Sequence, residues 1–241
     1  MSGVVLEFDQ VKADQVNGNE AAQLLSALRW PGEDPWLQTF ADGPSDLYIQ
    51  ETWKDRYGQP RVTEKFCVQG LSGTHSKRLT AAVSQYGRHS MADLTALRPP
   101  YVVQNSSARI GVFFAVNAID PEATRRSNDT VRRAAAVFLD MDGRPLPVGG
   151  FPLPPTAIVE SSPGRWHVYW AVSDLPLHEF TVVQRHLAKL YGGDPSVCDL
   201  ARVMRLPGYW HGKTETSFLS RLVELNAEAQ YTRADLLGEL A

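Results

Sequence analysis

Two aspartates separated by one residue, Asp140 and Asp142, stand directly after an apolar run in the segment AAAVFLDMDG. The run over residues 134–139 contains no polar residue, which predicts a buried β-strand that ends at the first aspartate. Because residues two apart on a strand point to the same side, both carboxylates should project together from its end. Two like charges held this close repel unless protons or cations offset them, and oxygen ligands suit Mg²⁺ or Mn²⁺. An Asp-Gly turn that ends a buried strand is the structural alternative.

A histidine follows these aspartates, in the segment WHVYW. Alternation on a strand places His167 and Tyr169 on one face, and Trp166, Val168 and Trp170 on the other. The second set is apolar and should pack inward. His167 is then left to face a cleft, where its imidazole can contact a phosphate oxygen. A histidine satisfied within the sheet is the structural alternative.

A third aspartate, Asp199, lies in the segment CDLARVMRLPG together with Arg202 and Arg205. If residues 199–202 form a helical turn, Asp199 and Arg202 stand on one face, either as a local ion pair or as site residues. In the functional interpretation Asp199 is a third acid of the metal site and Arg202 contacts nucleotide phosphates. Three acids that hold two cations can lower the pKa of an attacking 3′-hydroxyl and stabilise a pyrophosphate leaving group.

The charge of the chain is unevenly distributed around a formal net value of −3. Residues 1–55 carry ten acidic against three basic side chains, whereas residues 56–241 carry seventeen against twenty-one. The segment ATRRSNDTVRR contributes four arginines just upstream of the acidic strand, as either a solvated face or a phosphate-contacting patch. This composition permits a nucleic-acid partner and does not require one.

The overall composition is that of a globular protein, with 43% apolar and 21% charged residues among 241. The sequence contains no run of about 18 apolar residues, so no membrane span is predicted. The N-terminal segment lacks the pattern of a secretory signal. The two cysteines, Cys67 and Cys198, lie far apart, which argues against a zinc ribbon or a disulfide framework. We therefore expect a protein of the reducing cytoplasm.

The remaining pattern predicts strands interleaved with helices, and hence an α/β or α+β sheet core. A turn at Ser162-Pro163-Gly164-Arg165 favours type II geometry and predicts a β-hairpin, and Gly192-Gly193 should end a helix. The predicted helices are 21–30, 77–86, 91–97, 180–191 and one that starts near Thr232. The predicted strands are 62–68, 111–117, 134–139, 156–161, 166–172, 203–206 and 219–225.

Three motifs in this order resemble the archaeo-eukaryotic primase superfamily, in particular the RepB-like DNA primase domains of plasmids and phages. They are FLDMDG (138–143), SSPGRWHVYW (161–170) and DLARVMRLPGYWHGK (199–213). The strand GVFFAVN (111–117) is similar to the strand that precedes the acidic motif in that group. The resemblance implies an RRM-like catalytic sheet (106–241) packed against an N-terminal α/β module (1–105), together one primase-polymerase domain. The chain shows no cysteine-rich zinc stem and no helicase or helical accessory domain.

The resemblance also implies a chemistry and a set of site residues. Asp140, Asp142 and Asp199 are the implied catalytic ligands of two divalent ions, Mg²⁺ or Mn²⁺. The implied nucleotide-binding residues are His167, Arg202, Ser161, Asn117, Arg205 and Lys213. The implied enzyme is a nucleotidyltransferase that makes primers from nucleoside triphosphates on single-stranded DNA during plasmid or phage replication. The resemblance implies that this enzyme acts in the cytoplasm of a bacterial or archaeal cell and has no membrane partner. Its implied protein partner is a replicative helicase or another replication protein.

Two other enzymes and a calcium loop share part of the pattern. A haloacid-dehalogenase-type phosphatase would use Asp140 as nucleophile and Asp142 as general acid, but its motif continues with Thr or Val, where Arg144 stands. In an EF-hand the fifth and twelfth positions would be Arg144 and Phe151, which cannot be ligands. A relaxase needs His-x-His, whereas this chain has His167-Val-Tyr.

The non-enzymatic alternative is an RRM-like module that binds single strands by stacking bases on Trp166, Tyr169 or Trp170. Alternation assigns the tryptophans mainly to the core, so stacking would depend on Tyr169. Such a module has no use for three acids, which repel phosphate. A divalent-ion titration distinguishes a binder from an enzyme.

Overall fold

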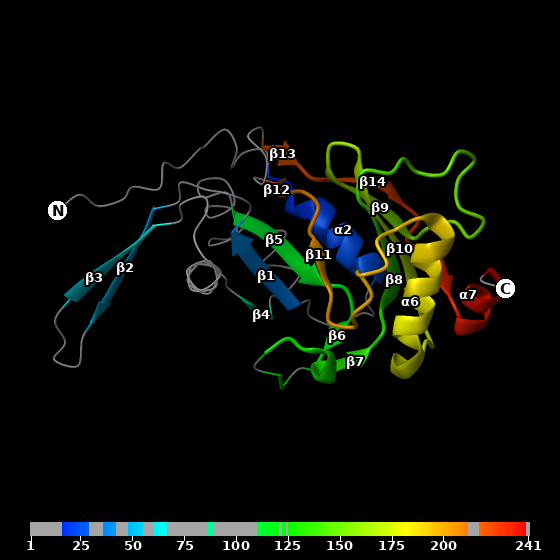
Figure 1. The fold of residues 1–241 in the computed structure, drawn as a ribbon, viewed down its shortest axis with the longest axis horizontal. Coiled ribbons are helices and arrows are strands. Elements are labelled where there is room, and N and C mark those ends of the chain that lie inside the picture. The colour runs from blue at the N-terminus through cyan, green and yellow to red at the C-terminus, as the bar shows by residue number, and fades with distance from the viewer. Residues whose placement is uncertain are drawn as a thin grey trace.

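The computed structural model describes residues 16–28, 36–41, 48–54, 60–66, 86–88, 110–120, 122–123, 125–211 and 217–239 (Figure 1). Two antiparallel sheets carry most of this part of the chain. The first has the strand order β11 (Val203–Arg205), β5 (Ile110–Ala115), β1 (Trp36–Ala41) and β4 (Tyr86–Arg88). The second has β14 (Arg221–Leu225), β9 (Ala157–Ser162), β10 (Arg165–Val172) and β8 (Ala136–Met141).

Strand β10 is the centre of the second sheet. It pairs with β9 on one side and with β8 on the other, since residues 166–169 have partners in both strands. The short strand β15 (Gln230–Tyr231) runs parallel to the end of β10. Strand β8 is therefore an edge strand among the described residues, and its outer side needs partners of another kind.

Three helices and three small ladders complete the described fold. Helix α2 (Gly18–Leu28) packs against β14 and β10, α6 (Leu177–Tyr191) lies along β8, and α7 (Arg233–Glu239) follows β15 (Figure 1). The ladders are β2 (Tyr48–Lys54) with β3 (Pro60–Phe66), β6 (Ala118–Ile119) with β7 (Val131–Arg133), and β12 (Trp210–His211) with β13 (Phe218–Leu219). A 3₁₀ turn, η1 (Asn128–Thr130), precedes β7. None of the described helices is long and apolar enough to cross a membrane.

Aromatic side chains fill both faces of the second sheet. On one face Tyr169 packs against Phe114 of the first sheet, with ring centroids 6.0 Å apart. On the other face Trp170 packs edge-on against Phe151 at 5.1 Å and stacks with Tyr191 of α6. The predicted alternation is confirmed in its main feature, because successive residues of β10 face opposite layers.

The local signals of the sequence predicted most elements after residue 110. The hairpin is formed, with Gly164 at φ 68°, the left-handed conformation that the third position of a type II turn requires. Helix α6 ends at Gly192, also at positive φ, but begins at Leu177, three residues before the predicted start. The acidic strand was predicted to end at Leu139, whereas the ladder with β10 continues through Met141.

The N-terminal part is described only in pieces. The helix predicted over 21–30 begins earlier, at Gly18, and ends at Leu28, and the strand predicted over 62–68 is β3. The helices predicted over 77–86 and 91–97 lie outside the described residues, apart from Tyr86, which is in β4. Strand β1 pairs with β5, so this region contributes directly to the first sheet. The module boundary near residue 105 stays a prediction.

Candidate functional site

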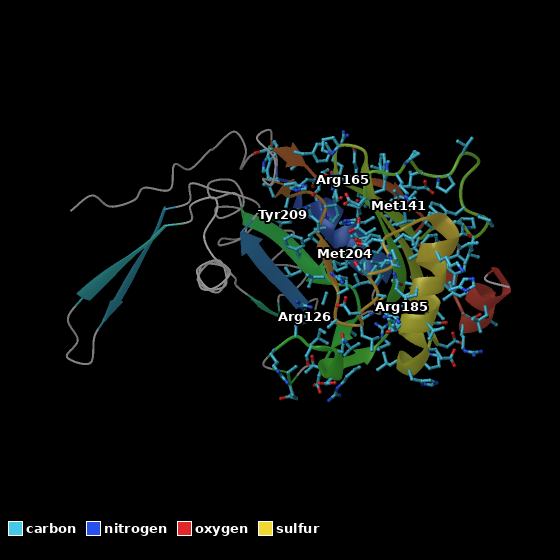
Figure 2. The ribbon with its side chains drawn as sticks, viewed as in Figure 1. Arg126, Met141, Arg165, Arg185, Met204 and Tyr209 are labelled. Carbon is cyan, nitrogen blue, oxygen red and sulfur yellow. The ribbon has the colours of Figure 1, made fainter. Side chains whose placement is uncertain are left out.

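A cavity of about 220 Å³ lies where the second sheet meets β5, β11 and β12. Arg165 of β10 and Met204 of β11, both labelled in Figure 2, are among the residues that line it. Its polar lining consists of Asp140, Asp142, Ser161, Ser162, Arg165, His167, Arg202, Arg205 and His211. The cavity thus gathers residues of all three sequence motifs, although these are far apart along the chain.

Asp140 and Asp142 both line this cavity, as their spacing predicted. Asp140 is the half-buried one, and burial raises its pKa to about 6, with repulsion from Asp142 and Asp194 adding to the effect. The positive charges of Arg165 and Arg202 act in the opposite direction. The negative charge of this carboxylate is therefore only partly offset by the protein.

Arg165 is a cavity residue that the sequence analysis did not single out. Its guanidinium forms an ion pair with the Asp142 carboxylate, and both side chains are more than half exposed. A surface pair of this kind contributes little to stability and can open when a ligand competes for either partner. The one available signal was its position in the turn of the predicted hairpin, beside the histidine strand.

Asp199 and Arg202 form an ion pair of 2.5 Å in the turn before β11. Arg202 lines the cavity, whereas Asp199 is not among the lining residues. Arg202 also donates to the Ser196 carbonyl at 3.2 Å and acts electrostatically on Asp140, so this turn stands beside the acidic strand. The described residues contain no group of three His, Cys, Asp or Glu side chains placed to hold a metal ion, and the convergence of the three aspartates on one metal site stays a prediction.

His167 faces the cavity on the same side of the sheet as Asp140, because the two residues are direct partners in the β8–β10 ladder. Only 7% of His167 is exposed, and burial, together with Arg205 and His211, lowers its pKa to about 3. The imidazole is consequently neutral at physiological pH. The side predicted for His167 is confirmed, although the residue is buried in the cavity wall.

A β-bulge in the ladder of β9 and β10 contains Ser161. Ser162 pairs with Arg165 and Glu160 pairs with Trp166, so Ser161 is the extra residue between them. Its hydroxyl donates to the Arg165 carbonyl at 3.3 Å, and its own carbonyl accepts a hydrogen bond from Nδ1 of His211 at 2.9 Å. Ser161 lines the cavity, as the nucleotide-binding assignment requires.

Arg205 lines the cavity with only 6% of its surface exposed. Its guanidinium carbon lies 4.6 Å from the centre of the Phe113 ring, a cation–π arrangement that fixes the plane of the group. Arginine in this setting is suited to bind planar or tetrahedral anions through its fork of donors. Of the remaining predicted residues, Lys213 lies outside the described part of the chain.

Asn117 is not among the residues that line the cavity, and its assignment to nucleotide binding stays a prediction. Its side chain is fully buried and its amide is occupied by backbone groups. Oδ1 accepts from the backbone N–H of Ala135 at 2.9 Å, and Nδ2 donates to the Leu200 carbonyl at 2.9 Å. Asn117 thereby joins the start of the acidic strand to the turn that carries Asp199 and Arg202.

Gln184 of α6 makes an equivalent link farther along β8, and sequence analysis missed it. Its Oε1 accepts from the Phe138 N–H at 3.1 Å, and its Nε2 donates to the Phe138 carbonyl. The same Nε2 lies 3.3 Å from the Val197 carbonyl. Because Asp194 also donates its backbone N–H to the Asp140 carbonyl at 3.0 Å, several polar groups on the outer side of β8 are bonded by groups other than a described strand.

The arginine-rich segment 125–133 is partly engaged within the protein. Arg126 (Figure 2) donates to the Ala201 carbonyl, and its burial lowers its pKa. Arg132 forms an ion pair of 2.7 Å with Asp120. Neither side chain is in the cavity lining, so the phosphate-contacting patch predicted for this segment stays a prediction.

The donor set suits a divalent cation. Asp140 and Asp142 offer hard oxygen ligands, and the raised pKa of Asp140 means that an added positive charge would relieve repulsion there. Three arginines in the same cavity provide the charge that a polyanionic ligand of such an ion would need. Asp140 and Asp142 therefore fit a metal site in their chemistry, while a third ligand is not fixed by the geometry.

Two solved structures share this fold. The primase-polymerase (AEP) domain of cyanophage S-2L matches with a TM-score of 0.53 at 19% identity, over 97% of this chain and 99% of that domain. The primase RepB′ matches with a TM-score of 0.51 at 16% identity, over 92% of this chain and 61% of that protein. The predicted mixed α/β fold of the archaeo-eukaryotic primases is thus confirmed. No curated protein matches the chain.

The two remaining sequence alternatives lose support to different degrees. Of the three aromatic residues proposed as stacking platforms, Tyr169 and Trp170 are 0% and 1% exposed, whereas Trp166 is half-buried and could still contact a base. A dehalogenase-type phosphatase is set aside by the family match, because the model of the RepB DNA-primase N-terminal domain matches residues 88–237, more than half of the chain. Those residues include every motif from the acidic strand to β12. The chain belongs to the RepB DNA-primase family.

Proposed function

We propose that this protein is a metal-dependent DNA primase or primase-polymerase that joins nucleoside triphosphates into short primers on a single-stranded DNA template. The observation that carries the proposal is the cavity that brings Asp140, Asp142 and His167 together with three arginines. Family membership and the fold shared with two primases support the same assignment. We place the reaction in plasmid or phage replication, in the cytoplasm of the host cell.

Asp140 and Asp142 would hold the divalent ions, Mg²⁺ or Mn²⁺, with Asp199 as the proposed third ligand. Bound there, such ions supply positive charge that favours ionisation of the primer 3′-hydroxyl and stabilises the pyrophosphate leaving group. Burial in the protein opposes ionisation of Asp140, and bound cations would favour its charged form. The protein contributes by holding the strand of Asp140 in place, through bonds that Asn117, Gln184 and the Asp194 backbone make to the outer side of β8.

Asp199 would reach the ions only if its contact with Arg202 changed. The two side chains are both about one third exposed, so their pair is accessible to a competing ligand. A triphosphate that engaged Arg202 would free the Asp199 carboxylate. In this way nucleotide binding and completion of the metal site would be coupled through one arginine.

The basic side chains would bind and orient the triphosphate. Arg205 lies over the Phe113 ring and Arg202 is in the adjacent turn, and both line the cavity. Arg165, which lines the same cavity, would exchange Asp142 for a phosphate oxygen. His167 and Ser161 add neutral polar groups, and Lys213 is a proposed further contact.

A labelled-nucleotide assay on circular single-stranded DNA tests this proposal. The protein is incubated with ribo- or deoxynucleoside triphosphates and Mg²⁺, Mn²⁺ or EDTA, and products are resolved on a denaturing gel. We expect short labelled products with either metal and none in EDTA. Template binding that survives EDTA without any synthesis would support a binding module instead, and release of inorganic phosphate from monoesters would support a phosphatase.

A further inference from the structure

His167 and Tyr169 form a buried polar pair on the cavity face of β10. The Tyr169 hydroxyl lies 3.4 Å from Nδ1 of His167, and the two rings are nearly perpendicular at 89°. Tyr169 is 0% exposed, whereas His167 is 7% exposed and lines the cavity. The two side chains therefore meet through their polar atoms, and only the histidine reaches the ligand space.

Burial of the hydroxyl determines the direction of this hydrogen bond. A buried O–H without an acceptor costs about 1–3 kcal/mol. Among the described residues, the one acceptor within hydrogen-bond distance of the Tyr169 hydroxyl is His167 Nδ1. If Nδ1 carried the proton, it would donate to the tyrosine oxygen and leave the hydroxyl proton without an acceptor. Tyr169 is therefore the donor and His167 Nδ1 the acceptor.

We propose that Tyr169 is a positioning residue that holds His167 in the tautomer with its proton on Nε2. In a neutral imidazole one nitrogen donates and the other accepts, so an accepting Nδ1 leaves the N–H at Nε2. His167 then offers a hydrogen-bond donor to the cavity, and its partner on the ligand is an acceptor oxygen. The identification of that oxygen with the triphosphate rests on the proposed function, whereas the tautomer does not.

The spectrum of the histidine in the variant Tyr169→Phe tests the tautomer directly. The substitution removes one oxygen and keeps the ring that packs on Phe114. Long-range ¹H–¹⁵N correlation of ¹⁵N-histidine-labelled protein should show His167 protonated on Nε2 alone in the wild type. In Tyr169→Phe the Nδ1 resonance should shift and the two tautomers should mix. The control Tyr209→Phe removes another buried hydroxyl outside the cavity lining and should leave His167 unchanged.

A pair of histidine variants provides a second test that does not depend on the folding of Tyr169→Phe. The amide nitrogen of His167→Gln reaches the place of Nε2, whereas that of His167→Asn reaches the place of Nδ1. With inorganic tripolyphosphate and Mg²⁺ as the probe, His167→Gln should bind within about threefold of the wild type. His167→Asn and Tyr169→Phe should each lose about three- to tenfold in affinity, the effect of one hydrogen bond.

Three results would overturn the inference: a wild-type His167 protonated on Nδ1, an unchanged His167 spectrum in Tyr169→Phe, or tighter binding by His167→Asn than by His167→Gln. Failure of the wild type to bind tripolyphosphate would count against the proposed function instead. The spectrum would still decide the tautomer in that case.

Discussion

Gln184 bonds both backbone polar groups of Phe138, so a helix side chain occupies the place of a strand beside β8. The same amide reaches the Val197 carbonyl, in the segment that leads to the turn with Asp199 and Arg202. One residue of α6 thereby connects two of the three motif regions. Among the strands that the structure describes, the acidic strand β8 is an edge strand, and side-chain amides bond its outer side.

Replacement of Gln184 by Met should be strongly destabilising. It keeps the volume of the side chain but leaves Phe138 N–H, Phe138 C=O and Val197 C=O without this partner in a buried setting. We expect the free energy of unfolding to fall by about 2–4 kcal/mol in urea denaturation. Arg185→Met, at the exposed neighbouring position of α6, is the control and should change it by less than about 0.5 kcal/mol. Equal losses in both variants would show that the amide has no special role.

The raised pKa of Asp140 predicts a pH-dependent stability. The pKa of the Asp140 carboxyl is about 6 in the folded protein and near 3.8 in the unfolded chain, so the protonated carboxyl favours folding. This contribution to the free energy of unfolding is complete below about pH 3.8 and is lost as the pH rises through about 6. In EDTA, Asp140→Asn should therefore exceed the wild type in unfolding free energy by up to about 3 kcal/mol above neutral pH. Below about pH 4 the difference should vanish.

Thermal and urea unfolding across this pH range measure that difference. Asp129→Asn, an exposed aspartate outside the cavity lining, is the control and should follow the wild-type curve. A constant offset between Asp140→Asn and the wild type at every pH would contradict the assignment of the shift to Asp140.

Without metal the folded protein favours the protonated form of Asp140. Added metal should make the folded protein favour the ionised form instead. An ion that binds only the folded protein stabilises it by RT ln(1 + [L]/Kd), about 1.4 kcal/mol at tenfold excess over Kd. Mg²⁺ or Mn²⁺ should raise the melting temperature of the wild type above neutral pH and leave Asp140→Asn with Asp142→Asn unaffected. An equal rise in both proteins would locate the metal elsewhere.

Most elements after residue 110 were predictable because their signals are local. The Pro-Gly turn, the glycine after α6 and the apolar run before Asp140 each specify a short segment. Strand pairing is different, since it depends on contacts between segments far apart in sequence. The pairing of β5 with β1 and β11, and the position of β8 at the edge of the described part of the second sheet, had no local signal.

The site was predictable where residue type alone indicates the chemistry. Asp140, Asp142, His167, Arg202 and Arg205 all line the cavity. Asn117 shows the limit of residue type as a signal, because an amide can bind a ligand or backbone groups equally well, and this buried one bonds backbone groups. Gln184 was missed for the same reason. For Asp199 the sequence left two alternatives, a local ion pair with Arg202 or a role in the site, and the structure shows that the ion pair is formed.

Arg205→Lys should separate the shape of the guanidinium from its charge. Lysine keeps the positive charge but loses the planar fork and the stacking on Phe113. We expect KM for the nucleoside triphosphate to rise about tenfold, corresponding to about 1.4 kcal/mol of lost binding, with kcat within about threefold. The control Arg221→Lys changes an exposed arginine outside the cavity lining and should leave KM unchanged. A fall in kcat alone would assign Arg205 to the chemical step.

Primer synthesis by the double variant Asp140→Asn with Asp142→Asn tests the central claim most directly. The assay follows labelled nucleotide on circular single-stranded DNA with Mg²⁺ or Mn²⁺, and unfolding curves show that the variant is folded. We predict no detectable primers from this variant, while the wild type and Asp129→Asn remain active. Primers made by the folded double variant at the wild-type rate would contradict a catalytic metal site on these two carboxylates.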